Sequence, residues 1–224
     1  MSNEERVRAL HEEAGLLENL GHRISEGEPM LEAIRAAGKS YPRFEEAFLN
    51  VHDVIRDGDS FADGFVGHEK LFQDFVPGMI DVAEETGEMN RIPIVVAGII
   101  RDMAKLVQRG GDPSRVKIAE MLDYWMLAEL LDVGLPLTRS LEILGKNSRS
   151  RNRTIWLDSI DSIRRGRQLG EVMRDYREER FPKEDAARLL AAERVMTDAD
   201  VSSPDSRVEV LRSIAERLKG EIFH

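Results

Sequence analysis

Apolar side chains recur at steps of three and four residues along most of the chain, which is the spacing of one face of an α-helix. The first such stripe runs from Val7 to Ile24. It follows a Ser2 to Glu5 segment that has the form of a helix capping box. No stretch shows the sustained two-residue alternation, rich in valine and threonine, that is typical of strands. The pattern therefore predicts an all-α protein of antiparallel helical bundles.

The pattern predicts six helices in each half of the chain. In the N-terminal half they begin near residues 3, 29, 42, 60, 72 and 89. In the C-terminal half they cover residues 116–133, 136–146, 150–165, 168–176, 182–196 and 206 to the end. Between the halves, two glycines followed by Asp112 and Pro113 disfavour helix. We therefore expect a first six-helix bundle at 1–108, a linker at 109–114 and a second six-helix bundle at 115–224.

The two halves share the positions of their turns. Gly134 and Pro136 repeat the spacing of Gly27 and Pro29, and Gly166 follows Gly134 at almost the same distance as Gly58 follows Gly27. Glycine suits the left-handed end of a helix, and proline suits the first turn of the next one. The apolar positions between these turns also correspond, whereas the charged positions differ. This spacing predicts a tandem duplication of one helical domain.

Composition narrows the class of protein. Of the 224 residues, 42% are hydrophobic and 33% charged, as in ordinary globular proteins. The longest apolar run, at 92–100, is too short to span a bilayer, and the N-terminus lacks the order of a signal peptide. There is no cysteine for disulfides or thiolate metal sites, and the net charge of −10 disfavours broad nucleic-acid binding. We therefore expect a cytoplasmic protein.

The order of motifs resembles a known family. A Gly-x-Pro turn is followed by a helix that ends in Ile55-Arg56-Asp57-Gly58-Asp59-Ser60-Phe61, and then by Met79-Ile80-Asp81-Val82-Ala83-Glu84-Glu85-Thr86-Gly87-Glu88-Met89. The first segment is similar to the helix-ending glycine turn of the type II secretion system F family. The second is similar to its Gly-Glu-x-x-Gly segment, with Ala83 in place of the first glycine. This family comprises inner-membrane platform proteins that also occur in type IV pilus machines.

The resemblance implies a role and a set of partners. The family normally carries this domain twice; in the second half Glu193 stands where Glu84 stands in the first, but the glycine is missing. Family members have membrane-spanning helices after each cytoplasmic domain, whereas this chain passes from Leu106 through a short polar linker into its second half. The implied role is therefore to dock on an assembly ATPase or a scaffold protein, with any association with the inner membrane made through these partners. A homodimer is compatible with exposed bundle faces.

Carboxylates gather around Gly87, where two predicted helices meet. Glu84, Glu85 and Glu88 flank this glycine. One interpretation is a capped turn, because carboxylates are favoured at the start of the following helix by its dipole. The other is a docking surface for a basic partner, or a divalent cation held together with Asp81, although the spacing is not that of a calcium loop.

A basic region stands out in an otherwise acidic chain. It consists of Arg149, Arg151, Arg153, Arg164, Arg165 and Arg167. These arginines are either ordinary surface residues or a patch that binds an acidic partner or phosphates. The second reading gives the alternative function, a regulatory protein that binds nucleic acid. No helix-turn-helix setting accompanies the patch, so we rank nucleic acid behind a protein partner.

Nothing in the sequence predicts catalysis. The Gly110-Gly111 segment lacks the lysine and hydroxyl of a nucleotide-binding loop. No nucleophile, base and orienting group occur in a recognisable set. The histidines lack the i, i+4 spacing of a metal-binding helix. We therefore expect a non-catalytic interaction protein with no cofactor and no metal, and we rank a small-molecule enzyme third.

Overall fold

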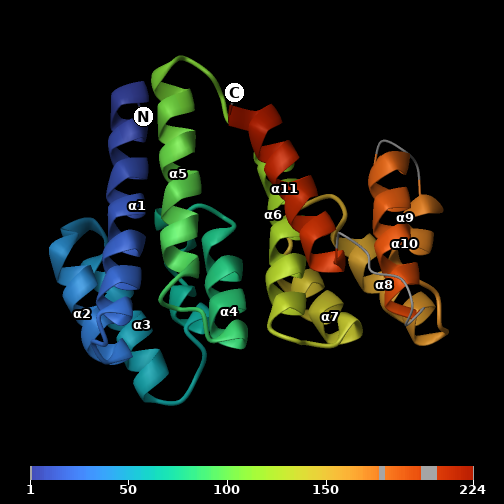
Figure 1. Ribbon diagram of the computed structural model, residues 1–224. Coiled ribbons are helices and arrows are strands. Elements are labelled where there is room, and N and C mark those ends of the chain that lie inside the picture. The colour runs from blue at the N-terminus through green and yellow to red at the C-terminus, as the bar shows by residue number, and fades with distance from the viewer. Residues whose placement is uncertain (1, 177–179, 198–205, 224) are drawn as a thin grey trace. The chain divides into compact units, whose positions relative to one another are not determined.

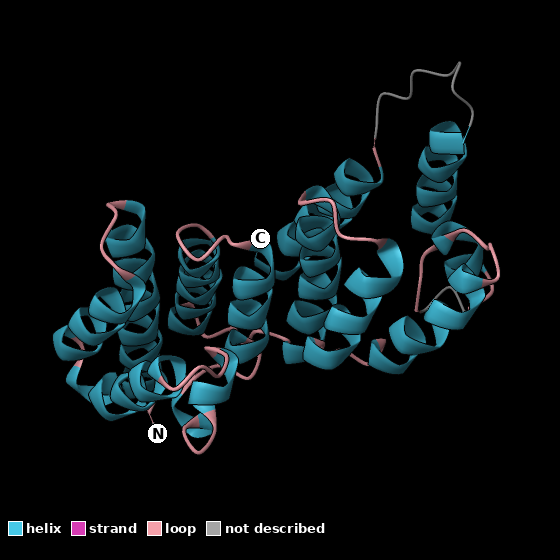
Figure 2. Ribbon diagram, turned by 90° about the horizontal axis from the view of Figure 1, so that it is seen from below, coloured by secondary structure: helices cyan, strands magenta, loops and turns pink. Residues whose placement is uncertain are grey.

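The computed structural model describes residues 2–176, 180–197 and 206–223. Over these residues the chain forms α-helices and short 3₁₀ helices, without a strand (Figure 2). The prediction of an all-α protein is confirmed for this part of the chain. The helices divide into two compact units, whose boundary lies between Pro113 and Ser114.

The first unit is built around two long helices. Its elements are α1 (Asn3–Ser25), α2 (Met30–Ser40), η1 (Pro42–Phe44), α3 (Glu45–Arg56), η2 (Ala62–Phe65), η3 (Glu69–Leu71), α4 (Val76–Thr86) and α5 (Ile92–Gln108). Helix α1 begins with the predicted capping box. The Ser2 hydroxyl accepts a hydrogen bond from the backbone N–H of Glu5 at 3.2 Å, and the Glu5 carboxylate accepts one from the backbone N–H of Ser2 at 2.7 Å. Helices α1 and α5 pack side by side along their length (Figure 1).

Phenylalanines pack together in the first unit, between α3 and the 3₁₀ segments. Phe48 and Phe61 meet edge to face at 6.4 Å between ring centroids, and Phe65 and Phe72 do so at 4.8 Å. All four rings are buried. Such aromatic pairs add to the free energy gained by burial alone. The sequence region after Ser60 is thus held in the core.

One predicted helix differs from the structure. The segment after Ser60 forms the 3₁₀ helix η2 of four residues rather than an α-helix. Its Gly64 lies so close to α3 that a Cβ atom there would come within 2.6 Å of the Cα atom of Val51. This close approach favours the short, tight turn, because a longer helix would need more room beside α3. The first unit therefore holds five α-helices where six are expected.

The second unit has one helix for each that the pattern predicts. These are α6 (Arg115–Asp132), α7 (Leu137–Asn147), α8 (Arg153–Arg164), α9 (Leu169–Arg174), α10 (Lys183–Thr197) and α11 (Arg207–Phe223). His224, the end of the last predicted helix, lies outside the described residues. Trp156 is fully buried at the centre, with Tyr124 and Phe181 edge to face at 5.9 and 5.2 Å.

Two pairs of helices, and the glycine turns beside them, correspond between the two units. Helices α2 and α7 both have 11 residues, and α3 and α8 both have 12. Each of the glycine turns that flank them has a positive φ: +88° at Gly27 and +85° at Gly134, then +100° at Gly58 and +87° at Gly166. This backbone conformation is one that glycine adopts without steric cost. The predicted turn residues therefore end their helices in both units.

Candidate functional site

Glu84, at the C-terminal end of α4, reaches back to the start of η2. Both of its carboxylate oxygens lie 2.9 Å from the backbone nitrogen of Phe61, which donates a hydrogen bond to them. Burial raises the pKa of Glu84, and the amides of Phe61 and Ala62 oppose that rise. The carboxylate thus satisfies backbone donors at the first turn of a short helix, which would otherwise lack a partner inside the protein.

The other two carboxylates lie nearer to solvent. Glu85 is exposed, and Glu88 forms an ion pair with Arg91 at 3.0 Å between Oε2 and Nε. Gly87 separates them in a left-handed conformation, with a φ of +72°, and ends α4. The three glutamates are therefore not equivalent: Glu84 accepts a backbone hydrogen bond, Glu88 pairs with Arg91, and Glu85 is exposed.

An open concavity of about 510 Å³ lies beside this turn. Ile24 and Met30 line it from the turn between α1 and α2, and Glu84, Gly87 and Met89 line it from the turn between α4 and α5. The structure thus brings together the two turns that the sequence marks separately, the Gly-x-Pro turn and the family-like segment. Among the described residues, no three carboxylate or histidine side chains are grouped so as to hold a metal ion.

The second unit has a carboxylate in a setting like that of Glu84. Glu193, on α10, accepts hydrogen bonds from the backbone N–H groups of Leu169 and Gly170 at the start of α9, at 3.1 and 2.8 Å. Its side chain is buried, and the guanidinium of Arg207 lies 3.1 Å away. Burial raises the pKa of Glu193, against the effect of these amides and of Arg207.

The predicted basic region divides between the two ends of α8. Arg149, Arg151 and Arg153 lie at its start, and Arg164 and Arg165 at its end. A helix of 12 residues is about 18 Å long. The structure therefore does not gather the arginines into one patch.

Several of these arginines already contact acidic or carbonyl groups. Arg151 forms an ion pair with Glu120, and Arg164 with Glu142 at 3.0 Å. Arg153 donates to the backbone carbonyl of Gly145 at 2.8 Å. Arg149 and Arg165 are exposed. Neighbouring acids thus offset part of the positive charge at both ends of the helix.

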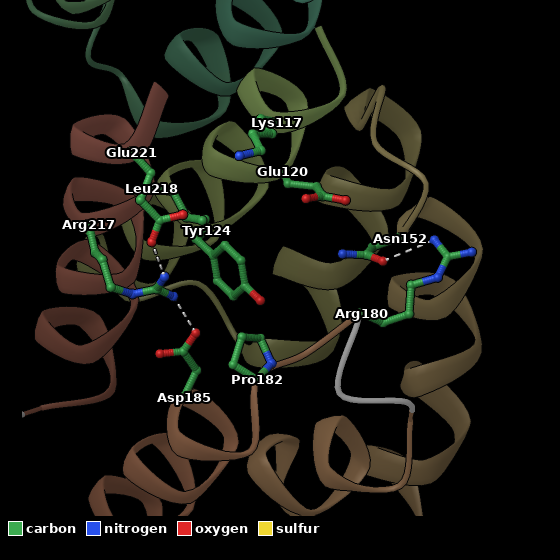
Figure 3. Close-up of a pocket in the computed structure, with 10 residues that line it drawn as sticks. All are labelled: Lys117, Glu120, Tyr124, Asn152, Arg180, Pro182, Asp185, Arg217, Leu218 and Glu221. Carbon is green, nitrogen blue, oxygen red and sulfur yellow. Dashed lines mark hydrogen bonds and ion pairs between the residues drawn. The ribbon is translucent and has the colours of Figure 1, made fainter. Parts of the chain in front are cut away.

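Polar groups inside the second unit were not predicted from the sequence. Asp123 is fully buried; it accepts hydrogen bonds from the indole Nε1 of Trp156, at 2.6 Å, and from the hydroxyl of Ser150. Burial raises the pKa of Asp123 to about 6. Beside it, a cavity is lined by Tyr124, Asn152 and other polar residues (Figure 3). In the sequence, Tyr124 and Asn152 stand where the first half has the apolar residues Leu17 and Phe44. This difference was the signal that could have indicated the cavity.

Part of the chain is similar to a known family. Residues 16–110 match the model of the family described as type II secretion system (T2SS), protein F. The match includes both turns beside the concavity and the segment from Met79 to Met89. Comparisons with curated proteins and with solved structures gave no match.

Within the described ranges, no helix is both long enough and apolar enough to cross a bilayer. The family match confirms the resemblance for the first unit and does not extend to the second. Residues 16–110 of this chain are therefore similar to the type II secretion system protein F family.

Proposed function

We propose that this chain is a non-catalytic scaffold of a secretion or pilus machine, which docks on the assembly ATPase or on a neighbouring scaffold protein. The observation that carries this proposal is the family match over residues 16–110. Platform proteins of this kind act by holding partners in place. We therefore expect the first unit to bind its partner protein through a surface.

The concavity beside Gly87 is the docking surface that we assign to the first unit. Ile24, Met30 and Met89 give it an apolar floor, and Glu85 and Glu88 stand on the turn next to it. An apolar centre with charges around it is typical of protein interfaces. The acidic side chains favour a basic segment of the partner. Glu84 belongs to the support of this surface, because its carboxylate is engaged with the amide of Phe61.

We also propose that the second unit is a diverged copy of the first. The matching bounds of α2 with α7 and of α3 with α8 support this. So does the pair of carboxylate contacts, because Glu84 with Phe61 and Glu193 with Leu169 join corresponding positions. Helix α10 is longer than α4, at 15 residues against 11, and lacks a glycine at the position of Gly87. The second unit would thus keep the fold and lose this surface turn.

The nucleic-acid alternative has less support. It needs a continuous basic surface, since affinity for the phosphate backbone grows with the number of phosphates neutralised. The arginines lie at both ends of α8, and Arg151 and Arg164 are paired with acids. A protein partner is therefore the function that we carry forward.

A co-purification experiment tests the proposal. The tagged chain is recovered from extract of its own cells with and without nuclease, and retained proteins are identified by mass spectrometry. The proposal expects a secretion or pilus ATPase or scaffold protein in both samples. Loss of all partners after nuclease treatment would favour the alternative and contradict the scaffold role.

Charge reversal then locates the surface. The double variant Glu85→Lys, Glu88→Lys should lose the partner, because it places positive charge against a basic segment. The matched control is Glu46→Lys, an exposed glutamate in the first turn of α3, beyond the far end of α2. Retention of the partner by the double variant would contradict the assignment of this surface.

A further inference from the structure

The second unit contains a cavity that the scaffold role does not use. Its volume is about 190 Å³, and it lies between α6, the start of α8, the start of α10 and α11 (Figure 3). This space would hold about six water molecules at their liquid volume. It is lined by Lys117, Glu120, Tyr124, Asn152, Arg180 and Arg217, among others.

A buried tyrosine faces this cavity. The side chain of Tyr124 is only 3% exposed, because its ring packs edge to face on Trp156. Figure 3 shows its hydroxyl pointing into the space between Asn152 and Pro182. None of the described residues forms a hydrogen bond with this hydroxyl. The hydroxyl is not sealed off from the cavity. It can therefore donate a hydrogen bond to a group that enters there.

The charges around the cavity are of both signs. Arg217 lies between two carboxylates, Asp185 and Glu221, each at 2.6 Å, and Glu120 is paired with Arg151. Together these five groups carry one net negative charge.

Two cations remain. Arg180 donates to two neutral acceptors, the carbonyl of Arg151 at 3.0 Å and the carboxamide oxygen of Asn152 at 3.5 Å. Lys117 is exposed at the mouth of the cavity. Neither forms an ion pair with a carboxylate of the described residues. The lining thus offers two positive charges and a phenol donor to an incoming group.

The corresponding place in the first unit is filled. At the position of Asn152 stands Phe44, which is fully buried and lies 5.2 Å from the ring of Phe72. At the position of Tyr124 stands Leu17, also fully buried. This comparison rests on the proposed duplication. It indicates that the opening comes from replacing apolar residues by Asn152 and Tyr124.

A third replacement acts through the backbone. In the first unit Glu13 accepts a hydrogen bond from the backbone N–H of Gln73, at 2.7 Å. In the second unit Glu120 stands at the position of Glu13, and Pro182 at that of Gln73. Proline has no N–H to donate, so Glu120 pairs with Arg151 instead. Glu120 thereby lines an open space rather than closing it.

We propose that this cavity binds a small oxyanion, the carboxylate or phosphate group of a metabolite, with Lys117 and Arg180 supplying charge and Tyr124 donating a hydrogen bond. Carboxylates and phosphates share the geometry that lysine and arginine recognise. The volume limits the bound group to roughly the size of succinate or phosphate. This inference does not depend on the docking partner of the first unit.

Titration of the full chain tests the proposal. Inorganic phosphate and succinate are added separately to the isotope-labelled protein, and the resonances of Tyr124 and of the Asn152 carboxamide are followed by NMR. Sodium chloride at the same ionic strength is the reference. We expect saturable shifts with phosphate or with succinate, and the probe that saturates identifies the class of oxyanion. The absence of saturable shifts with both would overturn the proposal.

Variants connect any binding to the cavity. Tyr124→Phe keeps the ring and removes the hydroxyl, and should weaken binding about fivefold. Lys117→Met should weaken it about tenfold. The matched control is Lys146→Met, an exposed lysine of α7 outside the cavity. Equal binding by Tyr124→Phe, Lys117→Met and the control would contradict the site.

A filling variant gives an independent readout. Asn152→Phe introduces the residue that the first unit has at this position, and should abolish the saturable shifts of Tyr124 while leaving the helical circular dichroism unchanged. A folded Asn152→Phe protein that still binds with unchanged affinity would overturn the assignment. Because the titration uses the isolated chain, its failure leaves the docking function untouched.

Discussion

At the scale of residues, a few buried or half-buried carboxylates join separate segments within each unit. Glu84 and Glu193 accept backbone N–H groups at the start of a short helix, and Glu13 accepts one from Gln73. Asp123 accepts a hydrogen bond from the indole N–H of Trp156. The sequence identifies Glu84 and Glu193 as corresponding residues. It could not identify their partners, because each contact joins positions that are far apart in the sequence.

Replacing Glu84 should destabilise the first unit. Glu84→Gln keeps one acceptor oxygen and removes the charge that strengthens the bond to Phe61, so we expect a loss of about 1–2 kcal/mol in the free energy of unfolding. Urea denaturation measures it. Glu85→Gln, at the exposed neighbouring position, should change stability by less than about 0.5 kcal/mol. Equal effects of the two variants would contradict the structural role of Glu84.

The stability of the first unit should depend on Glu13 in a defined pH range. Burial raises the pKa of Glu13 to about 7, against the opposing effects of Gln73 and Arg43. Between pH 4.5, the ordinary value, and pH 7, the folded state binds more protons at this group than the unfolded state. Raising the pH through this range therefore removes stability that Glu13 contributes when protonated.

The variant Glu13→Gln isolates that contribution, because glutamine keeps an acceptor for Gln73 and does not titrate. We expect the free energy of unfolding of the wild type, minus that of the variant, to fall as the pH rises from 4.5 to 7. It should be level outside this range. Urea denaturation at a series of pH values measures it, and a difference that rises through the range would contradict the assigned burial.

At the scale of elements, turns set where the helices end. The predicted turns at Gly27, Gly58, Gly134 and Gly166 all have positive φ values in the structure. These turns could be predicted because the demand on the backbone is local. The segment after Ser60 could not be, since its 3₁₀ form depends on how closely Gly64 approaches Val51 of another helix.

Replacing glycine by alanine should have opposite effects on stability in a turn and inside a helix. Gly58→Ala places a side chain at a φ of +100° and should destabilise the first unit by about 1 kcal/mol. Gly98→Ala lies inside α5, where a Cβ atom meets nothing within 4 Å, and should stabilise it by about 0.5–1 kcal/mol. Thermal unfolding measures both. A stabilising Gly58→Ala would show that the turn is not required.

At the scale of the whole molecule, the chain consists of two compact units, and the predicted interruption at 109–114 coincides with the gap between α5 and α6. The first unit carries the family match, and the second carries the polar cavity. The docking residues of the first unit were proposed from the sequence. The cavity was not, because its lining comes from four separate segments whose proximity appears only in the fold.

Each unit should fold alone. Each is a compact body of helices, so fragments 1–113 and 114–224 should each show helical circular dichroism and a cooperative thermal transition. The full chain provides the reference spectrum. A fragment 1–113 without a cooperative transition would contradict the division into independent units.

The most direct test of the scaffold role is a binding titration with the purified secretion or pilus ATPase from the same cells. The full chain and fragment 1–113 are each titrated against it, and the Glu85→Lys, Glu88→Lys variant is measured in parallel. The account predicts saturable binding by both wild-type proteins and at least about a tenfold loss for the variant. Saturable binding by neither the full chain nor the fragment would contradict docking on the ATPase.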